Sequence, residues 1–164
     1  MSFEVRPLSG KPFSIIAGLG KNFEMTVRWA TERDVITKRL IKAPQSRMYM
    51  FEAAITHQRA VELFHGFIAR TNALHETPEW YNTVTNTCTT KVVAVVDEVL
   101  PGQLSRTPRI LLPGMLPKYW STRGVLRYEG DFATAFEEAF INDRCREIGD
   151  VADFSRRLHR RNIS

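Results

Sequence analysis

The residue in this sequence best suited to covalent chemistry is Cys88. It lies in the polar segment 81–90, YNTVTNTCTT, which leads directly into a run of valines. A cysteine in the first turn of a helix faces unpaired backbone N–H groups and the positive end of the helix dipole, and both favour the thiolate. The same N–H groups suit the oxyanion that forms when a thiolate attacks an acyl carbon. We therefore treat Cys88 as a candidate nucleophile, with the cation Lys91 one turn later.

A purely structural role for Cys88 stays open on the residues alone. Free cysteines are among the most frequently buried residue types. Under this alternative, Thr85, Asn86 and Thr87 only cap the helix that follows. The second cysteine, Cys145, lies between two arginines and is interpreted as incidental. Two cysteines alone do not identify a redox compartment.

A cysteine nucleophile usually needs a base, and histidine is the commonest. The chain has four histidines. His57 and His65 fall on a predicted helix, and His159 falls in a basic tail. His75, expected in the loop after that helix, lies thirteen residues before Cys88 and is the best candidate base.

The sequence contains neither a glycine-rich phosphate loop nor a His, Cys and carboxylate cluster with metal-ligand spacing, so we predict no cofactor and no metal. The C-terminal arginines fit either a phosphate or anionic-lipid contact or a solvated helix end, where cations are favourable. The arginines in question are Arg156, Arg157, Arg160 and Arg161. Because no nucleic-acid reading element is recognisable, a nucleic-acid partner is not expected.

The composition is that of a folded globular chain. The 164 residues are 43% hydrophobic and 25% charged, with a net charge of +5. These values exclude disordered, collagen-like and disulfide-scaffold classes. No apolar run approaches the ~20 residues needed to span a bilayer. Residues 1–7 lack the apolar stretch of a signal peptide, so the sequence as written predicts a cytoplasmic protein that is not exported.

The first fifty residues are expected to form antiparallel strands. Residues 23–29 alternate apolar and polar side chains, which is the period of a strand with one buried face. Residues 13–17 form a shorter apolar run before a Gly-Leu-Gly turn. Residues 35–41 and 48–51 are expected to pair around the turn at 43–46.

Helical spacing dominates after residue 56. Thr56 is a plausible N-cap of an amphipathic helix whose apolar stripe faces the sheet and which ends before Pro78. The valines of 92–99 recur at helical spacing and predict a second helix that ends at Pro101. The proline-rich segment 101–124 is predicted to be a long ordered loop.

Two more helices are expected near the C-terminus. Phe132, Phe136 and Phe140 recur every four residues, which indicates a third helix. Asp131 suits its start, and the arginines at 144 and 146 suit its far end. A short last helix is expected over residues 150–158.

The segment 81–90 resembles the signature of the Lnb N-terminal periplasmic domain family, which is named after a lipoprotein N-acyltransferase. Four further segments resemble this family: 2–6 (SFEVR), 32–36 (ERDVI), 110–114 (ILLPG) and 153–157 (DFSRR). The resemblance covers nearly the whole chain, and the cysteine segment is its specific part. It implies an α+β, permuted papain-like domain over residues 1–128, with a helical extension over 129–164 packed on it.

The resemblance also implies a chemistry. Cys88 would be the nucleophile and would carry an acyl group as a thioester, with an amine or water as acceptor. The segment residues that would shape the site are Tyr81, Asn82, Asn86, Thr87 and Thr89. The substrate would be an acylated lipid or lipoprotein, handled in the periplasm at a membrane surface and without a cofactor.

The chain departs from the family pattern at two points. The family commonly has Asn directly before the cysteine, where this chain has Thr87. The family's histidine lies upstream of the strand that residues 3–6 resemble, so we expect either that Met1 is an internal start or that this is a shortened member. The rival interpretation is a non-catalytic domain that binds a peptide, lipid or envelope partner through the same groove.

Overall fold

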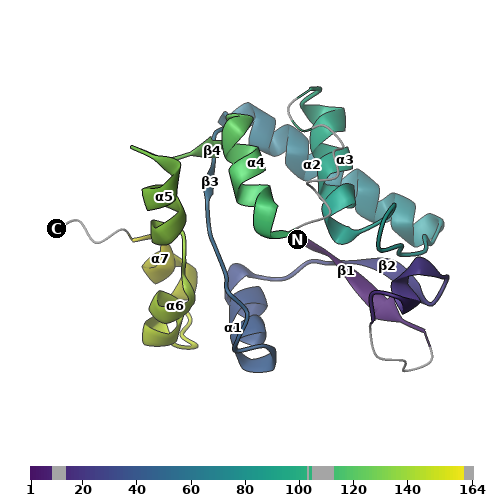
Figure 1. Ribbon diagram of the computed structural model, residues 1–164, viewed down its shortest axis with the longest axis horizontal. Coiled ribbons are helices and arrows are strands. Elements are labelled where there is room, and N and C mark those ends of the chain that lie inside the picture. The colour runs from purple at the N-terminus through teal and green to yellow at the C-terminus, as the bar shows by residue number, and fades with distance from the viewer. Residues whose placement is uncertain (9–13, 103, 105–112, 161–164) are drawn as a thin grey trace. The chain divides into compact units, whose positions relative to one another are not determined.

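The computed structural model describes residues 1–8, 14–102, 104 and 113–160 (Figure 1). The chain divides into two compact units. The first comprises residues 1–29 and 53–126, and the second comprises residues 30–52 and 127–164. Within the described ranges, seven α-helices and two antiparallel two-stranded sheets give the expected mixed α+β class. The predicted division of the chain at residue 128 stays a prediction.

The first unit is built on an antiparallel hairpin. Strands β1 (Ser2–Pro7) and β2 (Phe23–Arg28) pair in a register that places Phe3 opposite Val27. The period-two prediction is confirmed, because Phe23 and Met25 are buried on one face. Residues 79–81 lie along the other edge of β2. There the Met25 N–H donates to the Glu79 carbonyl over 2.8 Å.

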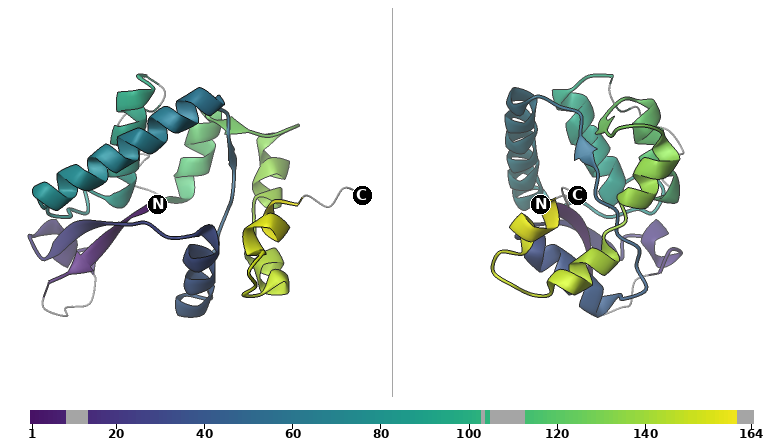
Figure 2. Two further views of the ribbon diagram at one scale, coloured as in Figure 1. Left: turned by 180° about the vertical axis from the view of Figure 1, so that it is seen from behind. Right: turned by 90° about the vertical axis from the view of Figure 1, so that its left-hand side faces the viewer.

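Two longer helices complete this part of the first unit, α2 (His57–Glu76) and α3 (Cys88–Val99) (Figures 1 and 2). Thr56 caps α2 as predicted, since its hydroxyl accepts from the N–H of Arg59. The helices approach closely at Gly66, where an added Cβ would lie 3.0 Å from Val99. Side chains from the hairpin and both helices share one core: Phe3, Phe23, Met25, Leu74, Tyr81 and Val95.

Only part of the apolar stripe predicted on α2 is buried. Leu74 lies in the core, and Phe67 packs against it. Phe64 is 51% exposed and packs edge-on against the ring of Trp29, at 5.7 Å between ring centroids. The Trp29 indole N–H donates to the hydroxyl of Thr71. The stripe therefore has a buried side and an exposed side that borders the end of β2.

The prediction of a long loop over residues 101–124 is wrong in part. Helix α4 (Leu116–Thr122) forms there, preceded by a 3-10 turn at Pro113–Met115. A proline in the first turn is compatible with a helix because its missing N–H would have no intrahelical partner. Tyr119 of α4 is buried with Val93 in a second core. Residues 105–112 lie outside the described part of the chain.

The second unit is helical. It contains α1 (Glu32–Lys42), α5 (Phe132–Glu138), α6 (Asn142–Ile148) and α7 (Phe154–His159). Its core is formed by four buried side chains: Ile141, Cys145, Phe154 and Leu158. The chain passes between the two units at β3 (Glu52–Ala53) and β4 (Leu126–Arg127), which pair with each other.

The predicted strand at residues 35–41 is wrong, because this segment lies in α1. Thr31 caps the helix by accepting from the N–H of Asp34 over 3.1 Å. Ile36 and Leu40 are four residues apart and both pack on the core of this unit. The expected pairing with residues 48–51 therefore does not form, and Tyr49 makes an isolated bridge with Phe140.

Two further predicted elements are corrected. The third helix ends at Glu138, and α6 is a separate helix that carries Arg144 and Arg146. Asn142 marks the break, because its side chain bonds the Met48 N–H and the Ser46 carbonyl. The strand expected at 13–17 is a turn followed by the 3-10 helix Ala17–Leu19, and Phe13 lies outside the described residues. Within those residues, no helix combines the length and apolarity that crossing a membrane requires.

The core of the first unit can be tested by comparing two phenylalanines. Phe23 is 0% exposed and Phe64 is 51% exposed. We expect Phe23→Ala to lower the free energy of unfolding by about 3–5 kcal/mol, because it leaves a cavity. Phe64→Ala should cost about 1 kcal/mol or less. Urea unfolding of the full chain measures both, and equal losses would contradict this placement of the core.

Candidate functional site

Cys88 is the first residue of α3, and its side chain is exposed. The burial of Cys88 that the structural alternative expected is therefore wrong, whereas the capping role that it gave to Thr87 is confirmed. Thr87 is the N-cap, and it forms a reciprocal capping box with Thr90. The Thr87 hydroxyl accepts from the Thr90 N–H over 3.1 Å, and the Thr90 hydroxyl accepts from the Thr87 N–H over 2.8 Å. Intrahelical acceptors do not reach the N–H groups of Cys88 and Thr89, which open the helix.

The turn before Cys88 is closed by its two asparagines. The backbones of Asn82 and Asn86 exchange two hydrogen bonds of 3.0 Å. The Asn82 side-chain oxygen accepts from the N–H groups of Val84 and Thr85, both over 2.9 Å. The Asn82 amide nitrogen donates to the Leu19 carbonyl. These bonds fix the backbone that leads into α3.

The turn also packs tightly against residues 15–18. The Thr83 hydroxyl donates to the Ile15 carbonyl, and the Thr83 N–H donates to the Gly18 carbonyl, each over 3.0 Å. A Cβ at Gly18 would lie only 2.3 Å from the Thr83 hydroxyl oxygen and 3.1 Å from the Tyr81 ring. Any larger residue at Gly18 would displace the turn. The sequence analysis did not identify Gly18 or Thr83, although the Gly-Leu-Gly turn was a signal.

Tyr81 links the turn to the core. Its N–H donates to the Phe23 carbonyl over 2.9 Å, and its ring packs edge-on against the Phe23 ring. Burial raises the pKa of the Tyr81 phenol, a hydrogen bond with Thr83 acts in the opposite direction, and negative charge on Cys88 raises it further. The Tyr81 hydroxyl therefore lies within electrostatic reach of the thiol.

The sequence analysis missed Glu79, which joins three elements at this site. Its carboxylate pairs with Arg70 of α2 and with Lys91 of α3, and it accepts from the Asn86 amide over 3.3 Å. Lys91, the cation expected to act on the thiol, is thus engaged by Glu79. Burial opposes ionisation of Glu79, but the bond and charge of Lys91, with Arg70 and Asn86, outweigh it, so the pKa of the carboxyl lies below its ordinary value.

Among the described residues, no histidine forms a hydrogen bond with Cys88. His75 lies in the last turn of α2 rather than in the predicted loop, and it is exposed. His57 and His65 are also exposed on α2. His159 contacts Glu32 in the second unit over 3.0 Å.

The second cysteine and two of the C-terminal arginines, which the sequence also singled out, have contacts within the second unit. Cys145 is buried in the second unit, and burial raises the pKa of its thiol, as does the nearby charge of Glu32. Arg156 and Arg157 both pair with Asp153. Arg161 lies outside the described part of the chain. Over the described ranges, no three His, Cys, Asp or Glu side chains are grouped to hold a metal ion.

The capping box can be tested at Thr87. We expect Thr87→Ala to lower the free energy of unfolding by about 1 kcal/mol, because the Thr90 N–H loses its acceptor. Thr87→Ser keeps the hydroxyl and should restore most of this loss. Thr85→Ala is the control in the same turn, since the Thr85 side chain is exposed. A Thr87→Ala variant as stable as the Thr85→Ala variant in urea unfolding would contradict the cap.

The paired state of Glu79 predicts an acid dependence of stability. Because its folded pKa lies below the ordinary 4.5, ionised Glu79 stabilises the fold above about pH 4.5. This contribution is lost as the pH falls through the folded value. Urea unfolding at a series of pH values from 6 to 3 should therefore show a shallower decline for Glu79→Gln than for the parent chain. Parallel declines would contradict the ion pairs.

The region that contains Cys88 matches a known protein family. Residues 1–123 of the 164 match the family described as the Lnb N-terminal periplasmic domain. No curated protein and no solved structure matches the chain. The matched range includes Cys88, its cap and the closed turn before it. The chain therefore belongs to the Lnb N-terminal periplasmic domain family.

Proposed function

We propose that this domain is a thiol-dependent acyltransferase or hydrolase that uses Cys88 as its nucleophile. The observation that carries the proposal is the exposed thiol at the first position of the capped helix α3, inside the region that matches the family. Helix dipole and first-turn N–H groups favour a thiolate there. The family name, with its periplasmic location, is consistent with a substrate from the cell envelope.

The proposed reaction has two steps. The Cys88 thiolate attacks the acyl carbonyl, a carbon–sulfur bond forms, and the alcohol or amine leaves with a proton. An amine or water then attacks the thioester, takes the acyl group and returns the thiol. The N–H groups of Cys88 and Thr89, in the first turn of α3, would donate to the oxyanion in both steps. No step needs a cofactor.

The finer assignments belong to the same proposal. The fold would be the permuted papain-like arrangement, in which a strand histidine precedes the cysteine in sequence. Asn82 and Asn86 would hold the turn, with Tyr81, Thr87 and Thr89 shaping the site around the thiol. His75 is retained as a candidate proton acceptor. The substrate would be an acylated lipid or lipoprotein at a membrane surface.

A second candidate function is a non-catalytic domain that binds a peptide, lipid or envelope partner. It is favoured by one observation: within the described residues, Cys88 has no hydrogen bond with a histidine. Under this candidate, Cys88→Ser would leave binding of the partner unchanged.

Alkylation of Cys88 separates the two candidates. In a Cys145→Ser background, Cys88 is the only thiol, and we expect iodoacetamide to modify it well below pH 8. With an activated acyl ester, intact-mass measurement should detect a hydroxylamine-sensitive adduct that Cys88→Ser abolishes. The converse variant, which keeps Cys145 and lacks Cys88, is the control for buried-thiol reactivity.

An alkylation profile like that of an ordinary thiol, with no acyl adduct, would contradict the catalytic proposal. A His75→Gln variant tests the base. Loss of acyl turnover with alkylation retained would assign proton transfer to His75, and full turnover would exclude it.

A further inference from the structure

We propose that Glu79 is the positioning residue of Cys88: its carboxylate holds the first turn of α3 against α2 and the turn at 82–86, and it offsets the charge of Lys91. This inference rests on the proposed function only in that it concerns the same thiol, Cys88. It concerns how the fold sets the reactivity of that thiol, whichever substrate it meets.

The positional part of the argument rests on three contacts of one carboxylate. One Glu79 oxygen pairs with Arg70 of α2. The other pairs with Lys91 of α3 and accepts from the Asn86 amide, which also donates to the Trp80 carbonyl over 2.7 Å. The Glu79 backbone is itself fixed to β2 through its carbonyl. Glu79 is thus attached to β2, to α2, to α3 and to the turn that precedes Cys88.

The electrostatic part rests on Lys91. Its side chain is only 12% exposed, and it follows Cys88 by three residues, so the two lie on neighbouring positions of one helix face. An ammonium three residues along the same helix attracts negative charge at the thiol position, and partial burial weakens its screening by solvent. The ionised Glu79 carboxylate, paired with Lys91, opposes this attraction. Removing the Glu79 charge should therefore make Cys88 more reactive, and removing the Lys91 charge should make it less reactive.

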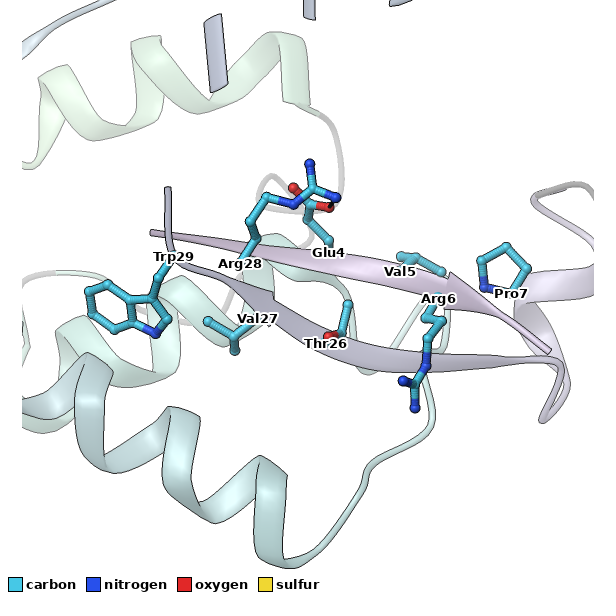
Figure 3. Close-up of a pocket in the computed structure, with 8 residues that line it drawn as sticks. All are labelled: Glu4, Val5, Arg6, Pro7, Thr26, Val27, Arg28 and Trp29. Carbon is cyan, nitrogen blue, oxygen red and sulfur yellow. Dashed lines mark ion pairs between the residues drawn. The ribbon is translucent and has the colours of Figure 1, made fainter. Parts of the chain in front are cut away.

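Several other charged groups on the elements that pack against α3 are paired with other residues. On β1, Glu4 pairs with Arg28, which reaches across the hairpin to it in Figure 3, and Arg6 pairs with Glu24. On α2, Arg59 pairs with Glu62 and reaches the Val99 carbonyl, at the far end of α3 from Cys88. The phenol of Tyr81 is a further titratable group within electrostatic reach of the thiol. On α2, His75 and Glu76 lie in the last turn and are exposed. The Glu79 cluster differs from these groups in that it includes an ion pair with a residue of α3, Lys91.

The test measures iodoacetamide alkylation of Cys88 against pH in the full chain, with Cys145→Ser as the background. We expect Glu79→Gln to shift the profile to lower pH, with a rate about threefold higher at pH 7. Lys91→Met should shift it to higher pH by a similar factor. Glu79→Asp keeps the charge and should stay close to the background. Both shifts should shrink at high salt, since part of the field crosses solvent.

Glu24→Gln is the matched control, because Glu24 also forms an ion pair with an arginine in the same unit. It should leave the alkylation profile unchanged. A purely structural role for Glu79 would lower the melting temperature of Glu79→Gln and leave the profile in place, and that result would overturn the inference. If Glu79→Gln does not fold, Lys91→Met alone decides, since an unshifted profile would also overturn it.

The outcome is separable from that of the proposed function. Opposite shifts in Glu79→Gln and Lys91→Met support the inference even when no acyl adduct forms on Cys88. An acyl adduct with unshifted profiles would support catalysis and overturn the role of Glu79.

Discussion

The attachment of residues 79–81 to the edge of β2 is the interaction on which the site depends. Two backbone hydrogen bonds make it, from Met25 to Glu79 and from Tyr81 to Phe23, and they extend the hairpin by a third short segment. Phe23 is fully buried, so this edge is anchored in the core. The closed turn and the first turn of α3 follow directly from it. The position of Cys88 is therefore fixed by its connection to the buried edge of β2.

The same arrangement explains how the polar segment before Cys88 forms a defined turn. Backbone polar groups near a core must find partners. Here the side chains of Asn82, Asn86 and Thr83 form hydrogen bonds with backbone groups in and around the turn. The capping box of Thr87 and Thr90 provides partners for backbone N–H groups at the start of α3. Threonine at position 87 accepts the hydrogen bond that an N-cap residue must accept, so the cap of α3 is complete.

Different interactions predominate around the two cysteines of the chain. Around Cys88, charge pairs and backbone hydrogen bonds predominate, and the thiol itself is exposed. Around Cys145, apolar packing predominates, and burial raises the pKa of the thiol. One chain therefore carries an exposed cysteine at the start of a helix and a buried cysteine in a core. The difference comes from the helix position and the surroundings, since the side chain is the same.

The sequence by itself determined the features that depend on neighbours along the chain. The alternation of 23–28, the cap at Thr56 and the helical spacing of the valines after Cys88 all follow from local periodicity and capping. The strand predicted at residues 35–41 is a helix, because Thr31 caps it and Ile36 and Leu40 pack on the core of the second unit. Only the tertiary structure decided that Cys88 is exposed and that Lys91 pairs with Glu79. Those outcomes depend on which distant elements meet, because Arg70, Glu79 and Lys91 belong to three separate segments and local spacing cannot encode their encounter.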